Sequence, residues 1–282
     1  AGMANLRMYQ FTSLGRPLKP GVRPGKVVVY TMAAAAVIGL VSGWMRRPEV
    51  VPALISAGTF ALAVFGSWAL ARELMPDDKS VAYLSMSAGL LAVLLAESPG
   101  LLIVFVTLGL VRLVNRSSGL PPRPTDSLVL MLLSIGVIYW VGMPLFGLVA
   151  ALAFALDGSL SDRLRGQWIY ALLCFGAAVV YVVDHDIGLA ALHWPHTLFE
   201  WLSVLFLLIF ALDALLLKRV RSRGDVNGLT LDLQRVRGGM LVGVLAAAQG
   251  INQLQEVVII VATVAGLCAG IAFRKGFRVN PK

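Results

Sequence analysis

The chain has 282 residues, of which 58% are hydrophobic and only 14% are charged, and its formal net charge is +9. A soluble domain of this length needs far more charge to cover its surface, so the composition excludes an ordinary soluble protein. The positive balance does not indicate a nucleic-acid partner, because membrane proteins concentrate lysine and arginine on one side of the bilayer. The composition predicts an all-α, polytopic integral membrane protein.

Apolar stretches recur from residue 26 to residue 273. A spanning helix needs about 20 apolar residues, because each residue advances ~1.5 Å through a hydrocarbon core of ~30 Å. We expect the shorter stretches to be marginal crossings, or re-entrant segments sheltered by neighbouring helices. The clear candidates are Lys26–Trp44, Val50–Ala71, Val81–Ala96, Gly100–Arg112, Gln167–Val183 and Thr197–Leu217.

Two longer apolar regions, Ser127–Leu156 and Gly238–Phe273, each fit one long helix or a hairpin of two. The first is interrupted by "GMPLFG" and the second by "QGINQLQE". If both are hairpins, ten helices place every one of the 24 lysines and arginines except Arg46 and Arg47 on one side. The positive-inside rule assigns that side to the cytoplasm. We therefore expect about ten transmembrane helices with both termini cytoplasmic, in a prokaryotic inner membrane.

This topology divides the chain into a basic cytoplasmic tail (1–25), a transmembrane domain (26–273) and a second basic tail (274–282). The basic face is expected to bind anionic lipids. Three glycine pairs four residues apart predict close helix packing, either within one chain, in a homo-oligomer or with other membrane subunits. These pairs are Gly39/Gly43, Gly239/Gly243 and Gly266/Gly270.

All three histidines lie within "DHDIGLAALHWPHTLFEW", residues 184–201, on the expected outer face. Imidazole and carboxylate groups bind divalent metals, and a catalytic metal needs about three such ligands with an open position. The alternative is an ordinary membrane interface, with tryptophans at headgroup depth and an acid favoured in the first helical turn. The sequence favours the interface. The candidate metal ligands are His193, His196, Glu200, Asp184 and Asp186.

Polar residues inside apolar runs are functional candidates, because they are costly in lipid. Asp213 lies within "LLIFALDALLLKR", where it either reaches the basic face or acts as a coupling carboxylate. A second group forms the outer turn of a hairpin or lines an unwound segment that binds a solute. It comprises Gln249, Asn252, Gln253 and Glu256.

Acidic pairs also occur in the cytoplasmic loops, at Asp77-Asp78 and at Asp157 with Asp162. Membrane enzymes that bind magnesium and a diphosphate need several carboxylates on facing helices. These pairs lack that spacing and lie beside turn-forming proline and glycine, so we expect them to be exposed turn residues.

The function expected from this pattern is transport of a small solute or ion by alternating access, or a channel. Ten short spans in 282 residues are similar in topology to the drug/metabolite transporter group, and that likeness is one of topology alone. Two alternatives stay open. One is a non-catalytic subunit of a larger membrane complex, and the other is a metal-dependent enzyme acting on a lipid-linked substrate. Among these three functions, the sequence favours the enzyme least.

Overall fold

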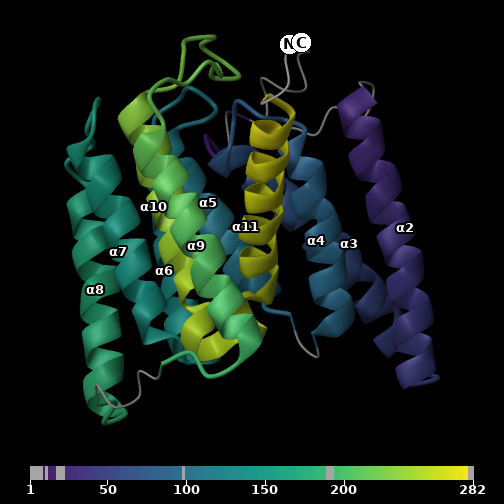
Figure 1. Ribbon diagram of the computed structural model, residues 1–282. Helices are drawn as coiled ribbons and strands as arrows, with labels where there is room; N and C mark the ends of the chain where they lie inside the picture. The colour runs from purple at the N-terminus through teal and green to yellow at the C-terminus, as the bar shows by residue number, and fades with distance from the viewer. Residues whose placement is uncertain (1–8, 10–11, 17–22, 97–98, 189–193, 279–282) are drawn as a thin grey trace.

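A computed structural model describes most of the chain as helices (Figure 1). The described residues are 9, 12–16, 23–96, 99–188 and 194–278. Within them lie ten α-helices and one π-helical turn, η1 (Val137–Val141), which continues α6. The helices are α2 (Arg23–Arg46), α3 (Val50–Leu74), α4 (Val81–Leu95), α5 (Leu101–Asn115), α6 (Pro124–Gly136), α7 (Pro144–Ser159), α8 (Gln167–Asp184), α9 (Leu198–Leu216), α10 (Leu233–Ala248) and α11 (Gly250–Arg278).

Six helices are long and apolar enough to cross a membrane, so the chain is an integral membrane protein by the length and composition of its helices. They are Gly25–Arg46, Val50–Leu74, Pro124–Val141, Gln167–Asp184, Leu198–Leu216 and Gly250–Phe273. Helices α4, α5 and α7 are apolar but shorter. The predicted all-helical fold is confirmed. That all ten helices cross the bilayer, and on which side the termini lie, stays a prediction.

Both ambiguous apolar regions contain two helices rather than one. Gly142 adopts φ +76°, a left-handed conformation that glycine tolerates, and Pro144 begins the next helix where its missing N–H costs nothing. In the second region α10 ends at Ala248, and Gln253 breaks the helical geometry early in α11 with φ −140° and ψ 62°. The interrupting residues named from the sequence are therefore the ones that end the helices.

Consecutive helices run in opposite directions, so α2 begins at the end of the bundle where α11 finishes (Figure 1). We call this end the basic end, because the basic loops between α3 and α4, α5 and α6, α7 and α8, and α9 and α10 lie there. The other is the opposite end. Helix α5 is central and contacts α3, α6, α7, α10 and α11, whereas α2 packs chiefly on α3 at the edge of the bundle.

The predicted glycine pairs all serve packing within the chain. A Cβ at Gly39 or Gly43 of α2 would lie within 3 Å of α3 atoms. A Cβ at Gly243 of α10 would meet Leu74, which also belongs to α3. A Cβ at Gly266 would lie 2.5 Å from Cα of Ser85 in α4. Close approach of this kind brings backbones together where no hydrophobic effect drives association in lipid.

A buried hydroxyl cluster completes this contact between α3, α4 and α11. The Ser67 hydroxyl donates to the Ser85 carbonyl at 2.6 Å and lies 2.7 Å from the Thr263 hydroxyl. The Ser85 hydroxyl in turn donates to the Thr263 carbonyl at 2.9 Å. All three side chains are fully buried, and buried polar groups need hydrogen-bond partners. Here neighbouring helices provide these partners. The three helices are expected to move as one unit.

Replacing Gly266 with alanine tests this packing. The new methyl group would overlap the α4 backbone, so we expect Gly266→Ala to lower the free energy of unfolding by about 1–3 kcal/mol. Gly176→Ala on α8 is the matched control, because no atom lies within 4 Å of its added Cβ. Unfolding in mixed micelles of denaturing detergent measures both. Equal stabilities for the two variants would contradict the predicted contact.

Candidate functional site: a buried ionic seal at the basic end

Asp157, near the end of α7, is fully buried and lies between two arginines. Its Oδ1 accepts a hydrogen bond from Arg116 Nε at 2.9 Å and one from Arg235 Nη1 at 2.7 Å. Arg116 follows the last residue of α5 in a left-handed conformation with φ 48°, and Arg235 lies in the first turn of α10. One carboxylate therefore joins the ends of three helices. The expectation that Asp157 is an exposed turn residue was wrong.

The two arginines of this cluster are themselves anchored. Arg235 Nη1 donates to the Val114 carbonyl at 3.1 Å, and its Nε donates to the Ser161 carbonyl at 3.1 Å. Burial lowers the pKa of the Arg116 guanidinium, although attraction from Asp157 opposes this effect. Removing Asp157 would leave two buried positive charges without their counter-charge.

A second buried carboxylate, Glu73 near the end of α3, is 1% exposed. Its Oε1 accepts from Arg112 Nε at 3.0 Å and from Arg16 Nη1 at 3.1 Å. Arg16 also holds Asp225, with Nε–Oδ2 and Nη2–Oδ1 distances of 2.5 and 3.0 Å. Burial alone would lower the pKa of Arg16, but the carboxylates of Glu73 and Asp225 raise it above its ordinary value. Arg16 is therefore held charged between α3 and the loop that precedes α10.

The N-terminal segment 12–16 lies across the basic end. Ser13 is 2% exposed, and its N–H and hydroxyl both donate to Oδ2 of Asp126, at 2.8 and 2.7 Å. The Leu14 carbonyl accepts from Arg112 Nη1 at 3.2 Å. This part of the predicted basic tail thus contacts the start of α6 and the end of α5.

The loop 217–232 is fixed to the same end. Asp77 accepts hydrogen bonds from the backbone N–H groups of Arg221 and Ser222, the shortest at 2.7 Å. The N–H of Val226 donates to the Ser118 carbonyl at 2.9 Å. Asp77 is exposed, as expected of a turn residue, and it also holds a neighbouring loop.

We call the two clusters together the ionic seal. It comprises Arg16, Glu73, Arg112, Arg116, Asp157 and Arg235. The seal joins α3, α5, α7 and α10 with the N-terminal segment, and it was not predicted from the sequence. The one local signal was the presence of Glu73 and Arg112 in the last turns of apolar helices.

Four of the five candidate metal ligands are described, and they lie at the opposite end. Asp184 ends α8 and is exposed, and its carboxylate lies 3.8 Å from Nδ1 of His185. Glu200 forms a capping box with Thr197, in which its carboxylate accepts from the N–H groups of His196 and Thr197, at 2.6 and 3.3 Å. Asp186 follows α8 with φ 53°, and His193 lies outside the described residues. Across the part of the chain that is described, no group of three or more potential ligands is arranged to hold a metal.

The other predicted residues occupy two places. Asp213 is half-buried on α9, which packs against α10 and α11. The segment 249–256 forms the turn from α10 to α11 and the first part of α11, and Gln253 Nε2 donates to the Gly142 carbonyl at 3.2 Å. The structure therefore brings two helix breaks together, at residues 142 and 253, and leaves Asp213 apart from them.

Comparisons with known proteins do not identify the chain. No family model, no curated protein and no solved structure matches it.

Asp157→Asn tests how much the ionic seal contributes to the free energy of unfolding. Two buried arginines would lose their counter-charge, so we expect the free energy of unfolding to fall by about 3–5 kcal/mol. Asp162→Asn is the control, because Asp162 is exposed and its positive φ of 53° suits asparagine. Detergent unfolding compares the two variants. A stable Asp157→Asn protein would show that water already reaches this carboxylate.

Metal analysis of the purified protein tests the histidine stretch. Because Glu200 caps its own helix, we expect the content of zinc and iron to be the same in the wild type and in His193→Ala/His196→Ala. Elemental mass spectrometry measures the metal per chain. About one equivalent that disappears in the double variant would contradict the interface interpretation and make this stretch a metal site.

Proposed function

We propose that the protein transports a small solute or ion by alternating access across a prokaryotic inner membrane, with the basic end in the cytoplasm. The observation that carries this proposal is the ionic seal. It joins charged groups from α3, α5, α7, α10 and the N-terminal segment at one end of the bundle.

Charged contacts of this kind are better suited to a gate than to permanent support. The attraction within a buried ion pair is largely offset by the removal of both charges from water, so apolar residues of similar size would hold the helices at least as firmly. Ion pairs can instead exchange their partners for water when helices separate. Interfaces that switch between two states commonly break and re-form such pairs.

The opposite end supports the proposal in a different way. There η1 interrupts the α-helical pattern, Gly142 is left-handed, and Gln253 is non-helical. π-Helical turns and helix breaks are frequent at functional sites, and transporters use broken helices to present backbone groups to a solute. We propose Gln249, Asn252, Gln253 and Glu256 as contacts near the outer entrance, and Asp213 as a coupling carboxylate.

Thr107 marks the proposed path through the centre. It lies midway along the central helix α5 and is fully buried, and its hydroxyl has no hydrogen-bond partner within the described part of the chain. An unpaired hydroxyl in an apolar core is costly, so it calls for a role. We propose that it contacts the solute or its water.

A second candidate function is that of a non-catalytic subunit in a larger membrane complex. It is favoured by the edge position of α2, which packs chiefly on α3 and exposes large apolar residues such as Val37, Val41 and Met45. A static subunit predicts that the interior around Thr107 is closed from both sides at all times.

Thiol labelling distinguishes the two functions. The background for labelling is Cys174→Ala/Cys268→Ala. In it, Thr107→Cys is treated with a membrane-impermeant maleimide from either side of the membrane. Asp162→Cys serves as a marker of the basic side, and Asp186→Cys as a marker of the opposite side. We expect position 107 to react from both sides, and Arg16→Gln to raise labelling from the basic side about tenfold if it shifts the gate by about 1.4 kcal/mol. Arg163→Gln, an exposed residue at the same end, is the control.

Absence of labelling at position 107 from both sides, in every variant, would contradict transport and favour the static subunit. Reaction of Asp162→Cys from the outer side would contradict the proposed orientation.

A further inference from the structure

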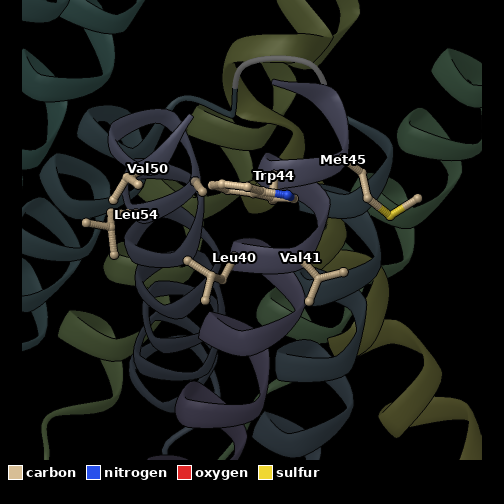
Figure 2. A pocket seen from close by; sticks show the side chains of 7 residues that line it. Leu40, Val41, Trp44, Met45, Val50 and Leu54 are labelled. Carbon is tan, nitrogen blue, oxygen red and sulfur yellow. The ribbon is translucent and has the colours of Figure 1, made fainter. Parts of the chain in front are cut away.

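Helices α2 and α3 enclose an open apolar groove near the opposite end of the bundle (Figure 2). Its volume is about 360 Å³, and its lining includes Leu40, Val41, Trp44, Val50 and Leu54. Figure 2 shows the Trp44 ring between Val50 of α3 and Met45 of α2 in this view. Pockets that hold small ligands measure about 300–1,000 Å³. The size therefore suits a ligand, and the walls suit an alkyl chain.

Two arginines lie in the chain between residues that line this groove, Met45 and Val50. Arg46 and Arg47 follow Trp44 almost directly, where α2 ends and a short turn leads to α3. Both are exposed, and neither forms an ion pair within the described residues. Glu49 is the only acid of this turn, so the turn carries a net positive charge.

The same two arginines are the exception in the charge distribution of the chain. Every other lysine and arginine among the 24 falls on the basic side of the predicted topology. Positive charge on the opposite side works against the orientation rule. An arginine pair there departs from the charge pattern that orients the rest of the chain.

We propose that the groove and the arginine pair bind one anionic phospholipid from the leaflet at the opposite end. An acyl chain fills the groove, Trp44 lies at headgroup depth, and the guanidinium groups of Arg46 and Arg47 hold the phosphate. Tryptophan favours that depth, and the guanidinium group matches phosphate oxygens in a bidentate geometry. This site lies outside the centre of the bundle and does not depend on the proposed transport.

A lipid fits these observations better than a partner helix. An apolar helix seated in the groove would leave the two guanidinium groups without a counter-charge, whereas a phosphodiester supplies one. The groove is also open rather than enclosed, and its lining is apolar.

Native mass spectrometry of the detergent-purified full chain tests the proposal. Phosphatidylglycerol and phosphatidylcholine with identical acyl chains are titrated separately. We expect the tightest-bound phosphatidylglycerol to bind about thirtyfold more tightly than phosphatidylcholine, because each of the two arginines attracts the anionic headgroup. Arg46→Gln/Arg47→Gln should abolish this preference at the tightest site and leave the weaker binding of anionic lipid at the basic end.

A second variant tests the groove without removing charge. Val50→Trp should fill the groove and weaken the binding of both lipids, and Val50 is 62% exposed, so the change leaves the core intact. The controls are Arg163→Gln/Arg165→Gln, an exposed basic pair elsewhere, and Val180→Trp, an exposed valine on α8. Both controls should bind lipid as the wild type does.

Three results would overturn the proposal. They are equal affinity of the wild type for the two lipids, a preference at the tightest site that survives the Arg46/Arg47 change, and an equal loss in the control arginine pair. A dimer that Val50→Trp dissociates would assign the groove to a second copy of the chain instead.

Discussion

The architecture of the basic end depends on the cost of burying a carboxylate. Asp157 is fully buried, and a carboxylate held away from water must be paired and hydrogen-bonded. Arg116 and Arg235 meet this requirement, and in doing so they fix the end of α5 and the start of α10 against α7. Glu73 imposes the same condition between α3 and α5 through Arg112. The central helix α5 thus contributes an arginine to each cluster, Arg112 from its last turn and Arg116 from the residue after its end.

Sequence reasoning succeeded where the signal was local. The thickness of the bilayer sets the length of an apolar spanning helix. Gly142 and Pro144 interrupt the helical pattern through their own backbone chemistry. The burial of Asp157 was missed because Gly158 and Ser159 follow it and resemble a turn, and its partners lie 41 and 78 residues away. Ser13 and Asp126 are 113 residues apart, so no local pattern indicates that they pair. The metal hypothesis for residues 184–200 stays a prediction, because His193 lies outside the described residues.

Polar contacts define two parts of the bundle, which the packing of α3 against α5 and α10 also joins. Buried hydroxyl groups and close glycine contacts hold α3, α4 and α11 together, and α2 packs on α3. The Asp157 cluster holds α5, α7 and α10. Between the parts at the basic end lie the Glu73–Arg112 pair and Arg16. A relative motion of the two parts at the basic end would have to break these pairs, which gives the proposed gate a physical location.

The measurement that tests this account most directly is the distance between the two parts at the basic end. Spin labels at the exposed positions Lys79 and Arg163 report it by pulsed electron paramagnetic resonance in lipid nanodiscs. The account predicts two distances, with the longer one gaining population in Arg16→Gln. A single distance, unchanged by Arg16→Gln, would contradict a gate and leave the ionic seal as a static support.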